Sequence, residues 1–482
     1  MLVNHKETIF RKLKKIINQP HSLFLLVGII FGGIFIVITP PLQGPDEQSH
    51  FLQTYMITEG NFINNPDDTY PVSLKSTYKT VFYNDDIRFK PTEKYESYRT
   101  KDALSIKLSP SIRETSSGYL QRTNYAPTNY IPQSIMVFLG KLFGLSPVLL
   151  TYLARIGGLV VWLLMVYFAI KITPIGKWAF FVVAILPVSM FQAAVVSADT
   201  LSFALLFVFL ALIIKITTSN KENTKLQITI LSIITILLSL TKFIMILFIP
   251  LIFLIIIKNK TNKSFFKNLD YKHLLWILPT LFISALFAKK WSVLSAGSVS
   301  SEGVPNGVNP GIQISNIFHH PTEFIYAFWN TNFFTWGDNM VRSTIGNFGW
   351  SDTPMSLSFL VLGYIIVFIA LTGNRGSDFE LLKNNLRKIT RLASSVLALI
   401  FFLLVCLALY IYYTPVNFNI IVGLQGRYFY PIFIIMVVVF INNNQLVLKL
   451  KAYNSIVKLA PILLLMVSCL YVYIRYYVNT SI

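Results

Sequence analysis

The chain has 482 residues, of which 54 % are hydrophobic and only 13 % are charged, and its mean hydropathy is +0.59. A soluble domain carries about 25 % charged residues, so this composition excludes an ordinary soluble protein and predicts a membrane protein with many spans. The net charge of +20 does not indicate nucleic-acid binding, because Lys and Arg gather in short segments between apolar runs, as the positive-inside rule describes. Cys406 and Cys469 lie inside apolar runs and predict packing, not a disulfide or a metal site.

A basic tail, 1–21, precedes the first apolar run, 22–39. The tail contains Arg-Lys-Leu-Lys-Lys at 11–15, which is typical of a signal peptide. No small-residue cleavage site follows the run, however, so we expect 22–39 to be retained as the first transmembrane helix. The tail is then cytoplasmic.

An acidic motif follows the first run directly. Residues 40–50 read Pro-Pro-Leu-Gln-Gly-Pro-Asp-Glu-Gln-Ser-His, so Asp46 and Glu47 are adjacent and His50 is close behind. Charges where a helix leaves the bilayer are unusual and indicate a functional site. The alternatives are a solvated loop start for the acidic pair and an ordinary hydrogen-bonded histidine for His50.

Ten further apolar runs are long enough to predict membrane spans. With the first run they predict an all-α integral membrane protein of about eleven transmembrane helices, with helices 2–7 in 148–290 and helices 8–11 in 355–482. The runs are 148–170, 178–196, 200–215, 226–242, 243–257, 273–290, 355–373, 393–412, 427–442 and 456–476.

The segment 130–146 decides the orientation of every later loop. It is short and carries Pro132 and Lys141. If it does not cross, six basic segments with 23 of the 41 Lys and Arg residues share the cytoplasmic side. If the segment crosses, the N-terminal tail alone of these six basic segments lies on the cytoplasmic side. We therefore predict a re-entrant or interfacial segment, and two large extracytoplasmic loops, 40–147 and 291–354, the first irregular with short surface helices.

This topology brings the scarce charges near the spans to the outer membrane face, which indicates one site. They are Asp46, Glu47, Arg155, Asp199, Lys242, Asp352 and Arg427.

Three of these residues are candidate phosphate ligands. The guanidinium groups of Arg155 and Arg427 offer two-pronged hydrogen bonding and Lys242 offers a point charge. A phosphate bound at the outer edge of a membrane indicates a polyprenyl-phosphate lipid. The alternatives are a carboxylate partner that only stabilises the bundle, for Arg155, and snorkelling to lipid headgroups, for Lys242 and Arg427.

Other residues are candidates for catalysis and sugar binding. Asp46 or Glu47 can serve as general base on an acceptor hydroxyl, with His50 as a third catalytic candidate. Aromatic rings can stack on a sugar, although interfacial aromatics are also ordinary belt residues. The stacking candidates are Trp336, Trp350, Tyr428 and Tyr430, and the substrate-binding candidates besides Trp350 and Tyr428 are Gln192, Asp199 and Asp352.

Several other functions lack their motifs. The sequence has no Gly-x-x-x-x-Gly-Lys-Ser/Thr loop for a nucleotide-driven motor and no His-Glu-x-x-His zinc motif. The charges avoid the predicted bilayer midplane and no inverted repeat is visible, which disfavours a secondary transporter.

Five ordered motifs resemble a bacterial polytopic family, domain of unknown function 2142, between about residues 20 and 475. The first is Gly-Pro-Asp-Glu-Gln-Ser-His, similar to the family's Pro-Asp-Glu-x-x-His signature. The others are Leu-Pro-Val-Ser-Met-Phe-Gln-Ala-Ala-Val-Val-Ser-Ala-Asp (186–199), Leu-Thr-Lys (240–242), Phe-Gly-Trp-Ser-Asp-Thr-Pro (348–354) and Gln-Gly-Arg-Tyr-Phe-Tyr-Pro (425–431).

Such proteins resemble membrane-embedded C-type glycosyltransferases, which place an acidic motif in the first outer loop and use polyprenyl-phosphate sugars. The resemblance implies Asp46 as catalytic base with Glu47 assisting, and Lys242 and Arg427 as ligands of the donor phosphate. It implies inverting transfer to a cell-envelope glycan or lipid, outside a bacterial cytoplasmic membrane. A divalent cation is a candidate cofactor, with Asp46, Glu47, Asp199 and Asp352 as oxygen ligands.

The chain departs from many C-type enzymes because it ends about six residues after its last predicted span, where they carry an outer domain. Acceptor recognition is then expected of loops 40–147 and 291–354 or of a partner membrane protein. Two other functions stay open: a polymerase or ligase of lipid-linked polysaccharide, and a non-enzymatic transporter or flippase of lipid-linked sugars.

Overall fold

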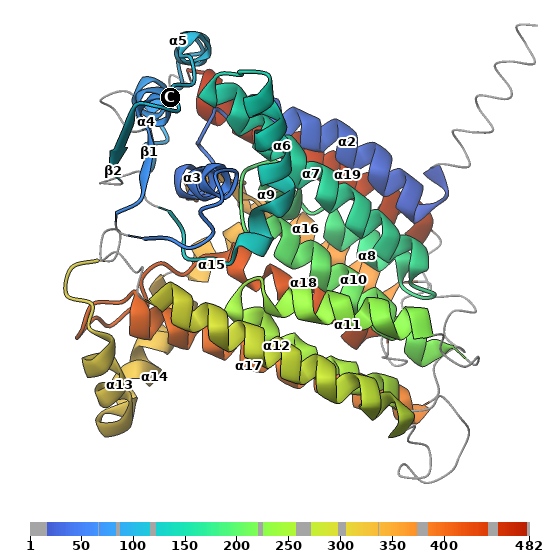
Figure 1. The fold of residues 1–482 in the computed structure, drawn as a ribbon. Coiled ribbons are helices and arrows are strands. Elements are labelled where there is room, and N and C mark those ends of the chain that lie inside the picture. The colour runs from blue at the N-terminus through green and yellow to red at the C-terminus, as the bar shows by residue number, and fades with distance from the viewer. Residues whose placement is uncertain are drawn as a thin grey trace, which may run out of the picture.

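The computed structural model is a bundle of helices that lie side by side, with the elements of both long loops gathered at one end, on the left of Figure 1. We call this end the loop end; it is the end that the sequence predicts to be extracytoplasmic. The structure describes residues 17–65, 67–82, 87–115, 122–219, 225–256, 271–296, 305–335, 337–373, 384–441 and 452–479.

Six of the described helices are long and apolar enough to cross a membrane, and four apolar helices are shorter. The predicted number of eleven spans stays a prediction. The long helices are α2 (Pro20–Ile38), α7 (Pro147–Ile172), α10 (Asp199–Thr218), α12 (Leu274–Ala296, preceded by η4, Tyr271–His273), α17 (Asn384–Tyr412) and α19 (Tyr453–Tyr477). The shorter ones are α11 (Lys225–Ser239), η2 (Phe243–Ile256), α16 (Leu357–Thr372) and α18 (Tyr430–Ile441), which follows η7 (Gly426–Phe429).

The predicted run 178–196 differs from a single helix. It forms α8 (Lys177–Ala184) and α9 (Pro187–Ala193), separated at Leu186, whose ψ of 142° is not helical. Pro187 explains the break, because a proline disfavours helical geometry in the residue before it and donates no backbone hydrogen bond.

The run 243–257 forms η2, a 3₁₀-helix of 14 residues that contains Pro250. Runs of 3₁₀-helix longer than three or four residues are uncommon. The 3₁₀ rise of about 2.0 Å per residue makes η2 about 28 Å long, near the ~30 Å of a bilayer core. An α-helix of this length reaches only about 21 Å. The stretched geometry therefore lets a short segment run the depth of the bundle.

The first loop contains short helices and one small antiparallel sheet. Its last helix, α6, has 12 residues and is about 18 Å long, less than a bilayer core; the re-entrant or interfacial placement of 130–146 stays a prediction. The elements are α3 (Glu47–Ile57), β1 (Thr69–Pro71), α4 (Val72–Phe82), α5 (Tyr98–Ser105), β2 (Arg113–Thr115, paired with β1), η1 (Pro127–Tyr130) and α6 (Ile131–Leu142).

The described part of the second loop contributes two short helices, a π-helical turn, a third short helix and a two-stranded hairpin. Trp336 and most of the basic segments used to orient the chain, including residues 1–16, lie outside the described residues. The elements are α13 (Pro310–His319), α14 (Pro321–Trp329), η5 (Asn330–Thr335), α15 (Gly337–Ile345), β3 (Asn347–Phe348) and β4 (Thr353–Pro354).

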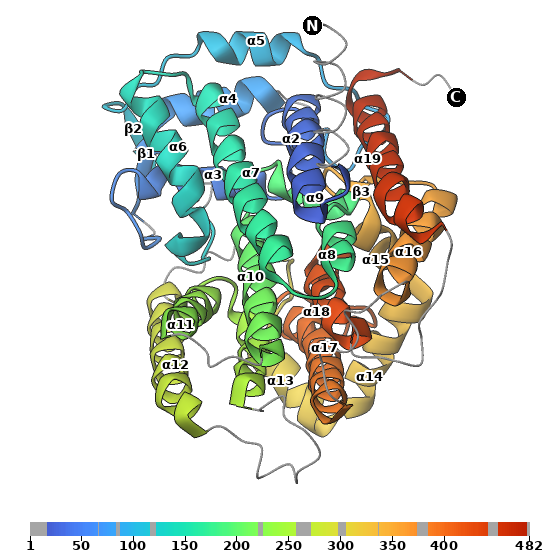
Figure 2. The ribbon, with the colours of Figure 1, turned by 90° about the vertical axis from the view of Figure 1, so that its right-hand side faces the viewer.

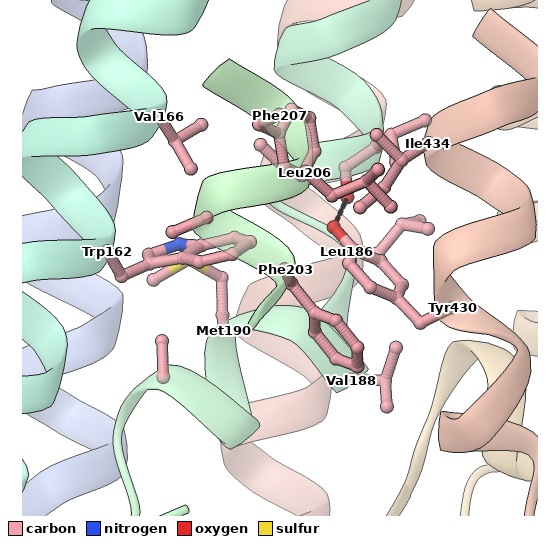
Figure 3. Close-up of a cluster of buried hydrophobic side chains, with 14 of the residues drawn as sticks. Trp162, Val166, Leu186, Val188, Met190, Phe203, Leu206, Phe207, Tyr430 and Ile434 are labelled. Carbon is pink, nitrogen blue, oxygen red and sulfur yellow. Dashed lines mark hydrogen bonds between the residues drawn. The ribbon is translucent and has the colours of Figure 1, made fainter. Parts of the chain in front are cut away.

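The centre of the bundle is closely packed. Side chains from α7, the α8–α9 break, α10 and α18 meet around Trp162, Phe203 and Tyr430 (Figure 3). The Tyr430 hydroxyl donates to the Val183 carbonyl at 2.7 Å, which satisfies a polar group inside this apolar cluster. At the periphery α2 packs against α19, so the first and last of the described helices are neighbours (Figure 1). The α11–α12 pair stands at the opposite edge of the bundle (Figure 2).

Candidate functional site

The acidic motif places two adjacent carboxylates in different surroundings. Asp46 adopts the left-handed conformation (φ 56°) directly before α3, and Glu47 is the first residue of that helix. This conformation is uncommon for a residue other than glycine. The Asp46 side chain is 52 % exposed, whereas that of Glu47 is fully buried. The two carboxylates therefore cannot be treated as one pair.

Glu47 forms an enclosed ion pair with Arg155 of α7. Both carboxylate oxygens accept from the guanidinium at 2.7 Å, one from Nε and one from Nη2. The remaining Arg155 donors reach three carbonyls at the end of α2: Nη1 contacts Ile36 at 3.0 Å and Thr39 at 2.7 Å, and Nη2 contacts Pro40 at 2.8 Å. Arg155 thus satisfies its five N–H donors within the protein.

The Glu47 carboxylate is equally well satisfied. It also accepts the backbone N–H of Gly44 and of Val196, each at 2.9 Å. This cluster ties the end of α2, the start of α3, α7 and the α9–α10 connection together. The geometry favours the alternative given for Arg155, a carboxylate partnership that stabilises the bundle, and leaves Glu47 no contact with an exposed surface.

Asp46 is linked instead to Arg427. The Arg427 Nη2 donates to the Asp46 carboxylate at 3.1 Å, and its Nε donates to the side chain of Gln425 at 2.7 Å. Arg427 is buried in η7, with a side chain only 7 % exposed. Two motifs at opposite ends of the sequence therefore meet at the loop end.

Lys242 and Asp199 form a second ion pair nearby. Lys242 lies in the turn between α11 and η2, and Asp199 begins α10. The Lys242 ammonium lies 5.1 Å from the ring centre of Tyr125 and 5.8 Å from that of Tyr428, within cation–π range. Burial lowers the pKa of Lys242, but the charge of Asp199, its hydrogen bond with Lys242 and the influence of Tyr125 together outweigh burial and raise the pKa to about 12, so the ammonium stays charged.

His50 lies between these two pairs. Its Nδ1 shares a hydrogen bond of 2.7 Å with the Tyr130 hydroxyl, which in turn shares one of 2.8 Å with Thr123. The imidazole stacks on Tyr125 with 6.0 Å between ring centres. Burial lowers the pKa of His50 to about 4, although the charge of Asp46 raises it. The imidazole is therefore neutral near pH 7.

Five residues from four sequence motifs thus form one site. We call them the polar cluster: Asp46, His50, Asp199, Lys242 and Arg427. The charges of the other four all act on the His50 imidazole. Two carboxylates and two cations make the polar cluster neutral as a whole.

An apolar cavity of about 660 Å³ adjoins the polar cluster. Asp199 and Lys242 line it together with Tyr125 and Tyr428, and the rest of its wall comes from Phe203 and from side chains of η2 and α17. Tyr428 also lies under Arg427, with 5.3 Å between guanidinium carbon and ring centre. Charged groups at one end of an apolar cavity are the arrangement expected for an amphipathic ligand.

The remaining candidates have other partners. Asp352 accepts from Arg475 of α19 at 2.8 Å, and both side chains are buried. The guanidinium of Arg88 lies 4.7 Å from the Trp350 ring. Gln192 is buried in α9. These contacts join the hairpin and α19 to the first loop and give no direct link to the polar cluster.

Sequence reasoning missed two residues that matter here. Tyr125 contacts both His50 and Lys242, and its position in an irregular loop gave no sign of these contacts. Arg475 was also missed, although a lone arginine inside the last apolar run is the signal of an intramembrane partnership.

The four carboxylates named as candidate cation ligands do not meet. Glu47 and Asp352 are each bound to an arginine. Across the part of the chain that the structure describes, no three His, Cys, Asp or Glu side chains form a group that could hold a metal ion.

One family matches the chain. The sequence model of a family described as "Predicted membrane protein (DUF2142)" aligns with residues 29–436, which cover all five motifs in full and the second half of α2. No similarity to a curated protein or to a solved structure was found. Because the match extends over most of the sequence, the chain belongs to this family of membrane proteins.

Proposed function

We propose that this DUF2142 membrane protein is a glycosyltransferase that moves a sugar from a polyprenyl-phosphate carrier to a cell-envelope glycan or lipid acceptor, at the extracytoplasmic face of a bacterial membrane. The observation that carries the proposal is the pairing of two cations with two carboxylates beside an apolar cavity that Asp199 and Lys242 line. Such a site fits a ligand that has an anionic head and an apolar tail.

The cations suit a lipid-linked phosphate. Lys242 and Arg427 come from separate motifs and both lie against Tyr428. The phosphodiester of the sugar donor carries one negative charge and competes with carboxylates for the N–H groups of these cations. Asp46 is the weaker competitor, because it holds Arg427 through one contact of 3.1 Å and is half exposed. Donor binding then displaces Asp46 from Arg427.

The displaced Asp46 is the general base. It accepts the proton of the acceptor hydroxyl while that oxygen attacks the anomeric carbon, and the carbon–oxygen bond to the phosphate breaks with inversion. Polyprenyl phosphate leaves, and Lys242 and Arg427 stabilise its charge. In this scheme Glu47 and Arg155 hold the backbone of the motif in place, and His50 with Tyr125 forms the wall beside the reacting groups.

The test is turnover of a polyprenyl-phosphate sugar by the purified protein in lipid nanodiscs, with release of free polyprenyl phosphate as the readout. We expect release by the wild type, and release by Asp46→Asn that is slower by about 10²–10⁴-fold. The matched control is Asp102→Asn, which removes another exposed carboxylate of the same loop and should keep full activity.

Other outcomes identify the alternatives. Equal activity of Asp46→Asn and wild type would exclude Asp46 as the base. Binding of the donor without release by either protein would support a transporter or flippase. Turnover only with diphosphate-linked glycans would support a polymerase or ligase.

A further inference from the structure

A second apolar cavity lies along the same two elements that line the first. The first, here called the loop-end cavity, is bounded by the start of η2 and by the end of α17, from Phe401 to Tyr412. The second, here called the distal cavity, has a volume of about 680 Å³ and is bounded by the end of η2 and by α17 from Ile389 to Leu397, with Tyr271 and Leu274 beside them.

The two cavities follow each other along the depth of the bundle. Together they cover α17 from Ile389 to Tyr412, which is about 35 Å of α-helix. Along η2 they cover nearly the whole 3₁₀-helix, about 28 Å. Both lengths are close to the ~30 Å of a bilayer core. The pair of cavities therefore extends well beyond one leaflet.

Among the described residues that line the two cavities, only those of the loop-end cavity carry charge. Asp199 and Lys242 line the loop-end cavity, whereas Tyr271 is the most polar residue around the distal cavity. A suitable occupant has a single anionic head, a thin apolar tail, and a tail longer than the ~15 Å of one leaflet. A phospholipid is less suitable, because its acyl chains match one leaflet and two of them must be accommodated.

We propose that the two cavities form one binding track for the tail of a long-chain polyprenyl phosphate, with Lys242 at its head. The proposal rests on the proposed function for the choice of carrier, but not on any transfer of sugar. The distal cavity then selects for chain length, because a short chain ends before it reaches α17 residues 389–397.

Binding of unglycosylated lipids to the full-length protein in detergent tests this. The probes are undecaprenyl phosphate, farnesyl phosphate and dioleoyl phosphatidic acid, which share a phosphate head but differ in tail. Ala393→Trp fills the distal cavity and Ala408→Trp fills the loop-end cavity. Leu399→Trp is the control, because Leu399 lies on the same helix, is 60 % exposed and lines neither cavity.

We expect Ala393→Trp to weaken undecaprenyl phosphate binding by about tenfold or more through lost apolar burial, with farnesyl phosphate unaffected. Ala408→Trp should weaken both, and Leu399→Trp neither. Ala393→Leu gives a smaller change in the same direction and replaces the tryptophan variant if that protein does not elute as a folded species. Unchanged undecaprenyl phosphate binding in both Ala393 variants would overturn the track.

The lipid source and the transferase are tested separately. Phosphatidic acid that binds as tightly as undecaprenyl phosphate, and responds equally to Ala393→Trp, would also overturn the assignment to a polyprenyl tail. A chain-length effect without any sugar transfer would uphold the track and reject the transferase. Sugar transfer without a chain-length effect would uphold the transferase and reject the track.

Discussion

Two carboxylate–arginine pairs, built from neighbouring residues of one motif, behave differently in this fold. The Glu47–Arg155 pair has two contacts of 2.7 Å, further backbone partners on both sides and no exposure. The Asp46–Arg427 pair has a single contact of 3.1 Å and a half-exposed carboxylate. The difference shows that the surroundings, and not the residue type, decide how firmly a carboxylate–arginine pair is held; in our proposal only the Asp46–Arg427 pair opens to a ligand.

The largest expected effect comes from breaking the enclosed pair. Arg155→Met leaves the Glu47 charge buried without its partner, which costs about 3–5 kcal/mol of folding free energy. We expect little folded protein after detergent extraction, measured by size-exclusion chromatography and thermal unfolding. The double variant Glu47→Leu with Arg155→Met removes both charges and should recover part of the loss. Normal stability of Arg155→Met alone would contradict a structural role.

Breaking the open pair should leave the fold intact and stop the chemistry. Asp46→Asn replaces a half-exposed side chain, so its unfolding temperature should stay close to that of the wild type. Loss of a general base lowers turnover by about 10²–10⁴-fold. The measurement is kcat beside thermal unfolding of the same preparation. A parallel loss of stability and activity would mean that Asp46 acts through the fold.

The pH dependence of folding stability tests whether the fold keeps the His50 imidazole neutral. Its folded pKa of about 4 lies below the ordinary 6.5, so the unfolded chain binds the proton more readily. The stabilising contribution is complete above about pH 6.5 and disappears as the pH falls toward 4, with a loss of about 2 kcal/mol between pH 7 and pH 5. The charged groups that act on the imidazole are Asp46, Asp199, Lys242 and Arg427, and the tyrosines that contact it are Tyr125 and Tyr130.

Thermal unfolding between pH 7 and pH 5 measures this contribution. His50→Gln keeps a polar side chain that does not titrate, and its unfolding temperature should fall less with pH than that of the wild type. Identical pH profiles of the two proteins would show that His50 is not held in its neutral form.

The smallest effect is expected from Arg427→Lys. The charge remains, but the two-pronged guanidinium that contacts Asp46 and Gln425 is replaced by a point charge. Loss of about one net hydrogen bond, ~1 kcal/mol, should weaken polyprenyl-phosphate binding about fivefold with the fold unchanged. Affinity measured at equilibrium checks this, with Arg427→Met as the larger reference loss. An unchanged affinity would place Arg427 outside the ligand site.

The positions of the membrane helices were largely predictable from the sequence. A bilayer requires long apolar runs whose backbone groups bond internally, and the predicted runs coincide with α2, α7, α10, α17 and α19. The 3₁₀ geometry of η2 was not predictable, because it depends on how a short segment with Pro250 packs between longer helices.

Most residues of the polar cluster were also predictable from the sequence, but the side chains with which they pair were not. Asp46, Asp199, Lys242 and Arg427 lie in separate motifs, and their meeting depends on contacts between distant segments. Arg155 was predicted as a phosphate ligand, yet its donors are used within the protein. Only packing in three dimensions decides which cation a buried carboxylate reaches.

By itself the sequence determined a helical membrane protein with its scarce charges gathered at one face, because the lipid environment makes each such charge costly and restricts where it can occur. The tertiary structure alone decided that Glu47 is enclosed while Asp46 stays accessible, because Asp46 has a left-handed backbone directly before α3 and Glu47 is the first residue of that helix. It also decided that Lys242 lies at the end of an apolar cavity, because η2 and α17 are brought together only by folding.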